Sequence, residues 1–244
     1  MKSVDQLKIK IFADGANKKE MLDRHQNSFI QGFTTNPTLM KKAGIIDYQA
    51  FAIDILKSIK DKPISFEVFS DDFQEMYKQA LQIAGFGKNV YVKIPVTNTH
   101  GESSFDLIQK LAKQGVKQNV TALMTLEQVH EVSHALADGP SAYISVFAGR
   151  IADTGRDPIP LMKEALSIMR PYPQQELIWA SPRELLNIFQ GDDIGCHIIT
   201  VTNDILKKLD LVGKELNEFS LETVKMFYED ATAAGFYLDI LEVA

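Results

Sequence analysis

The chain has 244 residues, 45% of them hydrophobic and 24% charged, which is the composition of a globular protein and excludes extensive disorder. Its formal net charge of -6 argues against nucleic acid or an anionic membrane as a partner, because neither polyanion attracts such a surface. The single cysteine, Cys196, excludes an intrachain disulfide and is typical of a reducing compartment. The first residues lack the apolar run of a signal peptide, so we expect a cytosolic protein with no membrane span.

Eight short apolar or β-branched runs predict eight strands, with segments of helical spacing between them. The helical spacing is clear after the third run, where Phe73, Met76, Tyr77 and Ala80 recur on one face. Alternating strands and helices predict right-handed crossovers and a parallel sheet. The runs comprise residues 9–14, 29–35, 64–69, 89–96, 118–124, 142–147, 176–181 and 197–202.

Eight such units predict an α/β fold of the TIM-barrel type, a closed (β/α)8 barrel, in preference to an open doubly wound sheet. No linker or low-complexity tract stands out, so we expect one domain over residues 1–244. The segment from about 205 to 244 reads as helical and is longer than one closing helix requires. We expect its Phe227, Tyr228 and Phe236 to pack over the barrel.

Polar side chains near the carboxyl ends of the predicted strands are the candidate site residues. In a barrel these ends meet at one mouth, whatever their separation in sequence, so polar groups there favour a functional interpretation. The residues are Asp14, Thr35, Asn36, Glu67, Lys93, Asn119, Thr121, Ser145, Arg150, Ser181 and Arg183.

Lys93 is the most informative of these, because an ammonium group is costly to bury without a partner in an otherwise apolar strand. Burial disfavours the charged form of a lysine and makes its amine a nucleophile toward carbonyls, the chemistry of Schiff-base enzymes. Two structural alternatives stay open: a lysine that reaches solvent, and an internal salt bridge with Glu67. The matching depths of Asp14, Asn36, Glu67 and Asn119 on neighbouring strands favour the nucleophile.

Three of the polar residues also have structural interpretations. Asp14 is a suitable N-cap for the following helix, and Asn36, which precedes Pro37, suits a turn that starts a helix. Glu67 could be a core carboxylate with its own partners, although burial without a charge partner costs several kcal/mol. Its position one strand from Lys93 favours a site.

Five segments resemble motifs of the transaldolase family and extend over most of the predicted barrel. TTNP followed downstream by VKIP and NVT is specific in this order and spacing, whereas any one of them alone is weak. The resemblance implies an enzyme that transfers dihydroxyacetone between sugar phosphates in the non-oxidative pentose phosphate pathway, without a metal or cofactor. The segments are FADGAN, TTNPTL, VYVKIPVT, NVTALM and SVFAGR.

The resemblance implies catalytic roles for four residues. Lys93 matches the Schiff-base lysine, which attacks the ketose carbonyl and acts as the electron sink for cleavage of the C3–C4 bond. Asp14 matches the residue that takes the proton of the C4 hydroxyl and later returns it to the acceptor aldehyde. Glu67 and Thr121 match the pair that positions the water used in carbinolamine dehydration.

The resemblance also implies a set of substrate-binding residues. Asn36 and Asn119 match the amides that hold the dihydroxyacetone hydroxyls, and Ser145 matches a further hydroxyl contact to that unit. Thr35, which adjoins Asn36, is expected to bind substrate with them. Together these groups would keep the enamine intermediate in place until an acceptor arrives.

Two positions bear on transfer against simple cleavage, because the family also contains fructose 6-phosphate aldolases that release free dihydroxyacetone. The aldolases typically have glutamine in the place of Glu67 and tyrosine in that of Phe147, so this chain resembles the transferases. We therefore expect a sedoheptulose 7-phosphate or fructose 6-phosphate donor and a glyceraldehyde 3-phosphate or erythrose 4-phosphate acceptor. Aldol cleavage stays the alternative.

Two departures from the family pattern concern Asp14 and the phosphate site. Gly15 stands where the family usually has threonine, which bears on how Asp14 is held. Arg150 matches a phosphate-binding arginine, and residues 180–183 resemble a motif in which a serine and a nearby cation bind phosphate, which implies Ser181 and Arg183. A second alignment places Arg183 at the N-terminus of the next helix, which could itself bind an anion.

His130 and His134 satisfy the H-E-x-x-H pattern of zinc proteases. The helical spacing directs Leu126, Val129 and Val132 toward the core and both histidines outward, and no third ligand is evident nearby. We expect a solvated helix face and no metal site.

The expected partners are therefore sugar phosphates, and the sequence leaves a homo-oligomer open. A noncatalytic barrel that binds sugar phosphates is an alternative of a different class. The joint presence of a nucleophile, an acid–base group and water-positioning residues argues against it.

Overall fold

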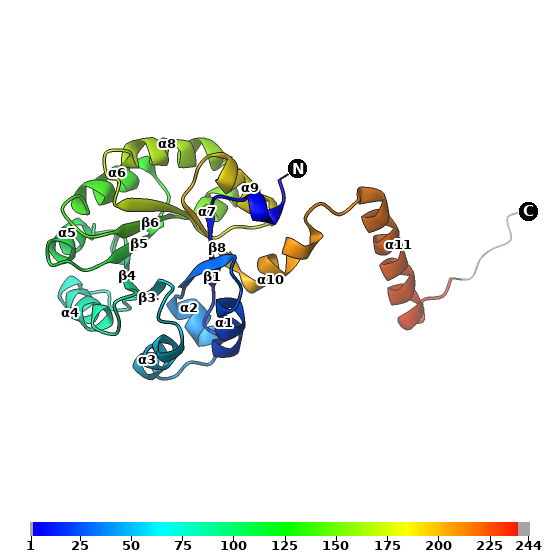
Figure 1. Cartoon of the computed structure of the whole chain (residues 1–244), viewed down its shortest axis with the longest axis horizontal. Helices are drawn as coiled ribbons and strands as arrows, with labels where there is room; N and C mark the ends of the chain where they lie inside the picture. Colours follow the sequence, from blue (N-terminus) through cyan, green and yellow to red (C-terminus); the bar gives the residue numbers. More distant parts are fainter. Residues whose placement is uncertain (1, 239–244) are drawn as a thin grey trace, which may run out of the picture.

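Eight parallel strands form a closed barrel in the computed structural model, which describes residues 2–238 (Figure 1). Each strand pairs with the next along the chain, and β8 closes the ring against β1. The predicted (β/α)8 fold is confirmed. The strands are β1 (Lys10–Asp14), β2 (Ile30–Thr34), β3 (Ile64–Glu67), β4 (Val90–Pro95), β5 (Gln118–Leu123), β6 (Ala142–Val146), β7 (Gln175–Trp179) and β8 (Ile198–Thr202).

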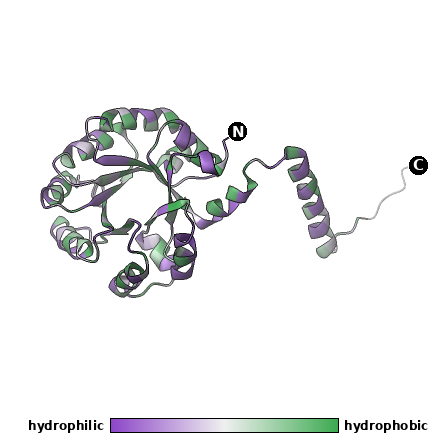
Figure 2. Ribbon diagram, in the orientation of Figure 1, coloured by the Kyte–Doolittle hydropathy of each residue, from purple (hydrophilic) through white to green (hydrophobic). Residues whose placement is uncertain are grey.

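The helices that follow the first seven strands surround the barrel, and hydrophobic residues recur among hydrophilic ones along them (Figures 1 and 2). None of the helices within 2–238 is long and apolar enough to cross a membrane. They are η1 (Val4–Gln6), α1 (Lys18–His25), α2 (Pro37–Lys42), α3 (Tyr48–Ser58), α4 (Phe73–Ala84), α5 (Phe105–Lys113), α6 (Leu126–Ala135), α7 (Ala148–Ala152), α8 (Ile159–Met169), α9 (Leu186–Asp193), α10 (Asn203–Leu206), η2 (Lys207–Leu211) and α11 (Leu216–Ala233).

The inside of the barrel has an aromatic floor. Tyr91 and Tyr143 stack with their ring centroids 4.0 Å apart, and Phe12 meets Tyr143 edge-on at 5.7 Å. Strand side chains alternate between the two faces, so the residue two positions further on each strand lies in the next interior layer. In β1, β4, β6 and β8 that layer is polar. Its residues are Asp14, Lys93, Ser145 and Thr200.

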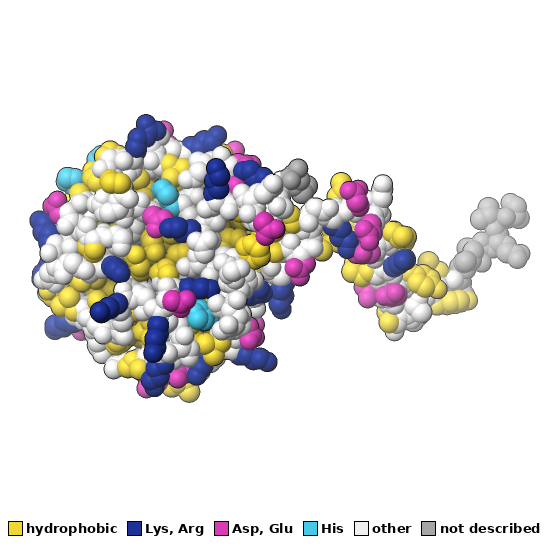
Figure 3. All heavy atoms as spheres, in the orientation of Figure 1, with side chains coloured by type: hydrophobic (Ala, Val, Ile, Leu, Met, Phe, Trp, Pro, Cys, Tyr) yellow, Lys and Arg dark blue, Asp and Glu magenta, His cyan; other side chains and the backbone are white. Residues whose placement is uncertain are grey.

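The C-terminal segment leaves the barrel instead of covering it. After η2 the chain turns at Gly213, whose φ of 82° is a left-handed conformation that suits glycine. Helix α11 then projects away, and none of its residues is buried (Figures 1 and 3). Phe227, Tyr228 and Phe236 are 62%, 73% and 81% exposed, so the prediction that they pack over the barrel is wrong. The end of the predicted tail, residues 239–244, lies outside the described residues.

The aromatic floor depends on a small residue opposite Phe12, which allows a direct test. A Cβ atom on Gly32 would lie 2.5 Å from the Phe12 ring, which is almost fully buried. We expect Gly32→Ala to lower the free energy of unfolding by about 1–3 kcal/mol, measured by urea denaturation, because the ring must move within a packed interior. Gly15→Ala is the control, since its Cβ would meet no atom within 4 Å. Equal stability of Gly32→Ala and wild type would contradict this packing.

Candidate active site

The carboxyl ends of the strands open into one cavity of about 520 Å³, to which every strand of the barrel or the loop after it contributes. All but two of the predicted site residues line it. This follows from the parallel barrel, which brings strand ends from distant parts of the chain to one mouth. The predicted residues in its wall are Asp14, Asn36, Glu67, Lys93, Asn119, Thr121, Ser145, Phe147, Arg150 and Ser181.

Lys93 lies at the bottom of this cavity with two partners. Its Nζ is 3.1 Å from Glu67 Oε2 and donates a hydrogen bond to the backbone oxygen of Thr35 at 3.0 Å. The parallel register places Glu67 directly beside Lys93 on the adjacent strand. The lysine side chain is 8% exposed, so the alternative in which it reaches bulk solvent is wrong. The salt bridge with Glu67 is present, and it places a proton acceptor next to the amine.

Thr35 supports the lysine from its backbone and does not line the cavity. Its hydroxyl donates to the backbone oxygen of Ser65 and is fully buried. Alternation along the chain turns the side chains of Thr34 and Asn36 inward and that of Thr35 to the other face. The expected contact between the Thr35 side chain and substrate is therefore corrected to a structural role.

Asp14 ends β1 and accepts a hydrogen bond from the Thr34 hydroxyl at 2.7 Å. Burial raises the pKa of Asp14, the Lys93 ammonium and the Thr34 hydrogen bond oppose that rise, and the Glu67 carboxylate adds to it. The N-cap of α1 is Asn17, so the interpretation of Asp14 as a helix cap is wrong. A carboxyl group with a raised pKa, in the same cavity as a lysine, is suited to exchange a proton with a bound ligand.

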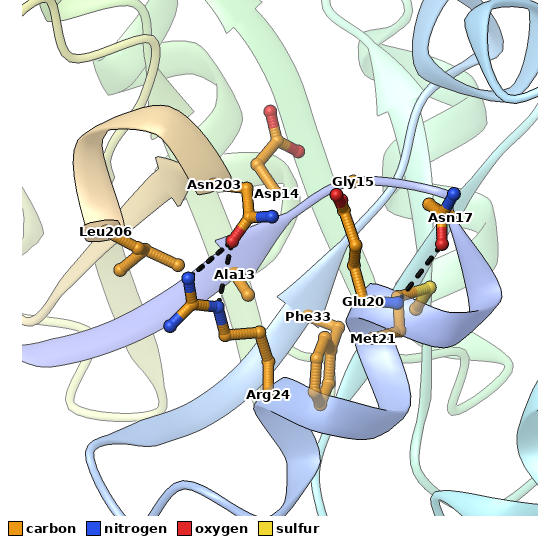
Figure 4. A pocket seen from close by; sticks show the side chains of 10 residues that line it. All are labelled: Ala13, Asp14, Gly15, Asn17, Glu20, Met21, Arg24, Phe33, Asn203 and Leu206. Atoms are coloured by element: carbon orange, nitrogen blue, oxygen red, sulfur yellow. Dashed lines mark hydrogen bonds between the residues drawn. The ribbon is translucent and has the colours of Figure 1, made fainter.

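A small pocket of about 20 Å³ lies behind Asp14 (Figure 4). Arg24 of α1 donates two hydrogen bonds to the side-chain oxygen of Asn203, at 2.9 and 2.6 Å, and so ties the start of the C-terminal segment to the barrel. The Asp14 carboxyl group points away from this pair in Figure 4. Gly15 has no atom within 4 Å of a Cβ position, and its N–H donates to the backbone oxygen of Thr34. The backbone next to Asp14 is therefore held by a hydrogen bond to β2, without a contribution from a side chain at position 15.

The Asn119 side chain has its orientation set by two serines. Its Nδ2 donates to Ser65 Oγ at 3.0 Å, and its Oδ1 accepts from Ser145 Oγ at 2.7 Å. The amide nitrogen carries a second N–H, which can donate to a ligand in the cavity that Asn119 lines. Thr121 Oγ1, in the same wall, is buried and has no hydrogen-bond partner in the structure over 2–238. A buried hydroxyl of this kind is expected to bind water or substrate, because leaving it unpaired costs free energy.

Two non-glycine residues of the cavity wall have left-handed backbone conformations. The φ angles are 68° at Ala122 and 60° at Ser181. Such conformations cost on the order of 1–3 kcal/mol and cluster at functional sites. Ser181 is held by its surroundings: a Cβ on Gly149 would lie 1.6 Å from the Ser181 backbone oxygen, so the start of α7 packs directly on this loop. This contact also places Arg150, the residue after Gly149, near the Ser181 loop, although the two segments follow different strands.

The cations at the rim differ from the prediction in one respect. Arg150 is exposed and lies over the Phe147 ring, with its guanidinium carbon 5.8 Å from the centroid. Arg183 donates to Asp153 instead and lines a neighbouring surface pocket. It also precedes α9, which begins at Leu186, so it is not the first residue of that helix. The guanidinium of Arg183 thus has a carboxylate partner outside the cavity wall, and its phosphate contact stays a prediction.

Some cavity residues were missed by the sequence interpretation. Thr34 and Thr200 line the wall and are almost fully buried, and Lys42 adds a cation from α2. The signal for Thr200 was the same as for Lys93, a polar residue inside an apolar strand. Thr34 follows from alternation, since it lies two positions before Asn36.

The H-E-x-x-H segment is a solvated helix face, as expected. His130 and His134 of α6 are exposed, and the ring of His134 stacks on Phe105 at 6.2 Å. Over residues 2–238 no three His, Cys, Asp or Glu side chains gather in a way that could hold a metal ion.

The chain is similar over most of its length to proteins of a known family. Residues 11–240 match the model of the family described as Transaldolase/Fructose-6-phosphate aldolase. The chain belongs to this family. A protein described as "Probable transaldolase" from Thermoanaerobacter sp. (strain X514) is 33% identical over 93% of this chain and 99% of its own length. Another "Probable transaldolase", from Dehalococcoides mccartyi, is 35% identical over 82% of this chain and 90% of its own.

Solved structures share the fold of this family member at low sequence identity. A 3-hexulose-6-phosphate synthase superimposes with a TM-score of 0.57 at 14% identity, covering 82% of this chain and 92% of that one. An aldolase, QR15, gives a TM-score of 0.54 at 11% identity, covering 85% and 99%. These likenesses concern the barrel alone.

The raised pKa of Asp14 predicts a stability effect. In the unfolded chain Asp14 has a carboxyl pKa near 3.8, so it releases its proton at lower pH than in the folded chain. The free energy of unfolding therefore falls as the pH rises from the unfolded pKa through the folded one. Asp14→Asn keeps an acceptor for Thr34 without the ionisation. We expect it to melt at a higher temperature than wild type at pH 7, with the difference shrinking toward pH 4. An equal or lower melting temperature at pH 7 would contradict the burial of a charge at this position.

Proposed function

We propose that this protein transfers a dihydroxyacetone unit from a ketose phosphate to an aldose phosphate through a Schiff base on Lys93. The observation that carries the proposal is a buried lysine in a cavity that also contains two carboxyl groups, Glu67 beside it and Asp14 across the mouth. Membership of the family and the relatives described as probable transaldolases support aldol chemistry in the same cavity.

Formation of the Schiff base uses Lys93, Glu67 and Thr121. The ammonium must lose a proton before it attacks the ketose carbonyl, and the Glu67 carboxylate 3.1 Å away can accept it. Addition of the amine to C2 gives a carbinolamine, whose hydroxyl takes up the proton that Glu67 accepted and leaves as water, which forms the iminium ion. The unpaired hydroxyl of Thr121 is suited to hold that water, together with Glu67.

Carbon–carbon cleavage uses Asp14. Its carboxylate takes the proton of the C4 hydroxyl, C4 becomes the carbonyl of the released aldose, and the electrons of the C3–C4 bond flow into the iminium ion to give an enamine. Asn36, Asn119 and Ser145 line the cavity and would hold the hydroxyls of the remaining three-carbon unit. With an acceptor aldehyde the steps reverse, and Asp14 returns its proton to the new C4 oxygen.

The far end of the substrate would lie at the rim, where Arg150 and Ser181 offer a guanidinium and a hydroxyl to a phosphate group. The proposed donors are sedoheptulose 7-phosphate and fructose 6-phosphate, and the acceptors glyceraldehyde 3-phosphate and erythrose 4-phosphate. This assignment places the reaction in carbohydrate metabolism, in the cytoplasmic pentose phosphate pathway.

Transfer is favoured over release of free dihydroxyacetone by Glu67 and Phe147. Glu67 is a carboxylate and not an amide, and it contacts the lysine directly. Phe147 lines the cavity wall and has no hydroxyl that could orient a water molecule there. Its ring packs against the guanidinium group of Arg150. The fructose 6-phosphate aldolase activity named in the family description is the second candidate.

The Schiff base can be trapped. Incubation with fructose 6-phosphate and then borohydride is expected to reduce the iminium ion and add the mass of the three-carbon unit to Lys93, read by peptide mass spectrometry. Lys93→Ala should show no adduct, whereas Lys163→Ala, which removes an exposed lysine of α8, should react like wild type. No adduct on wild type, or an undiminished adduct in Lys93→Ala, would sink the assignment.

Transfer and cleavage differ in their products. We expect fructose 6-phosphate and erythrose 4-phosphate together to give sedoheptulose 7-phosphate, and fructose 6-phosphate alone to give little free dihydroxyacetone, because the enamine is kept until an acceptor arrives. Arg150→Ala should raise KM for the phosphorylated donor, and the loss of a charge-assisted hydrogen bond predicts about a tenfold change or more. Rapid release of dihydroxyacetone without acceptor would assign the aldolase activity instead.

A further inference from the structure

Two threonine hydroxyls connect β8 to the carboxyl group of Asp14. Thr200 Oγ1 forms a hydrogen bond with Thr34 Oγ1, and Thr34 Oγ1 donates to Asp14 Oδ1 at 2.7 Å. A hydroxyl carries a single proton, and an ionised carboxylate can only accept. The proton of Thr34 is therefore used on Asp14, so the proton between the two threonines comes from Thr200. The chain of donation runs in one direction, from β8 through β2 to β1.

The geometry points to Thr200 as a positioning residue for the proton transfer at Asp14. We infer that Thr200 holds Thr34 in the rotamer that donates to Oδ1, which leaves Oδ2 as the carboxylate atom that exchanges a proton with the substrate. This inference rests on the proposed function for the role of Asp14. The hydrogen-bond chain itself is present in the structure without any ligand.

The barrel brings these hydroxyls together across the inner face of β1. Strand β1 lies between β2 and β8, and in the register Asp14 pairs with Thr34 whereas Thr200 pairs with Phe12. The Phe12 ring fills the space over Gly32 in the layer below, so the two hydroxyls rest on a packed apolar floor. Thr34 and Thr200 are 3% and 7% exposed. Little water competes for these hydrogen bonds, which increases their effect on orientation.

Several charged groups face Asp14, and Thr200 differs from all of them. Lys93 from β4 lowers the pKa of Asp14, and Glu67 from β3 raises it. From α1, Glu20 and Arg24 line the small pocket behind the carboxyl group. Since Thr200 carries no charge, its removal changes the hydrogen bonding of Asp14 and leaves these electrostatic contributions in place. A change in the titration of Asp14 when the Thr200 hydroxyl is removed is therefore attributed to the hydrogen-bond chain.

The test compares Thr200→Val with Thr200→Ser. Valine keeps the shape of threonine without the hydroxyl, and serine keeps the hydroxyl. The titration of Asp14 is measured by carboxyl ¹³C NMR on the protein without ligand, and its resonance is assigned as the one missing in Asp14→Asn. Asp14 should titrate at higher pH in Thr200→Val than in wild type, because a weakened hydrogen bond stabilises the carboxylate less. Thr200→Ser should titrate like wild type. An unchanged titration in Thr200→Val overturns the inference, whether or not the protein proves to be a transaldolase.

Kinetics give a second readout. On the acidic limb of the donor-cleavage profile, Thr200→Val should be slower than wild type by about three- to tenfold, the usual effect of one hydrogen bond, with a smaller loss on the alkaline plateau. Trapping of dihydroxyacetone on Lys93 needs no proton transfer from a C4 hydroxyl and should be undiminished. An equal loss at every pH, with no displacement of the limb, would assign Thr200 a purely structural role and overturn the inference. Failure of wild type to trap dihydroxyacetone would instead contradict the proposed function alone.

Discussion

A buried ammonium group inside an apolar strand is the constraint on which the rest of this site depends. Lys93 is acceptable there because Glu67 and the backbone oxygen of Thr35 contact its Nζ. Strand register places Glu67 of β3 beside Lys93, and Thr35 directly follows β2, where its N–H donates to the backbone oxygen of Ser65. Removing one member of such a buried pair typically costs about 3–5 kcal/mol, because the other charge is left uncompensated. The contacts that hold the buried lysine are thus also contacts between neighbouring segments of the barrel.

The cavity concentrates features that oppose stability. Asp14 is a buried carboxyl group with a raised pKa, Thr121 has a buried hydroxyl without a partner within 2–238, and Ala122 and Ser181 have left-handed backbone conformations. The layer beneath supplies the compensation: a closed aromatic and aliphatic floor in which Phe12, Tyr91 and Tyr143 are at most 8% exposed. Because this floor is buried and packed ring against ring, it supports the polar layer above it in a fixed arrangement.

The two ends of the cavity are built differently, which suits the two parts of the proposed substrate, a sugar phosphate. The deep end fixes its polar atoms through hydrogen bonds between buried side chains, as in the contacts of Asn119 with Ser65 and Ser145. The rim is held by close backbone packing of Gly149 on the Ser181 loop, and its cation, Arg150, stays exposed. A reacting carbonyl needs fixed geometry. A phosphate group is bound mainly by charge, so an exposed cation can bind the phosphates of proposed substrates that differ in length.

The sequence by itself determined the barrel, its strands and most of the cavity wall, because alternation within a strand is local and parallel strands must end at one mouth. It singled out Lys93 as a charge among apolar neighbours. Only the tertiary structure decided contacts between segments: Arg183 pairs with Asp153, the tail departs after Gly213, and the hydroxyl of Thr200 reaches Asp14 through Thr34. Those outcomes depend on which side chains meet across strands and loops far apart in the chain. The hydrophobic periodicity of a single strand or helix does not contain that information.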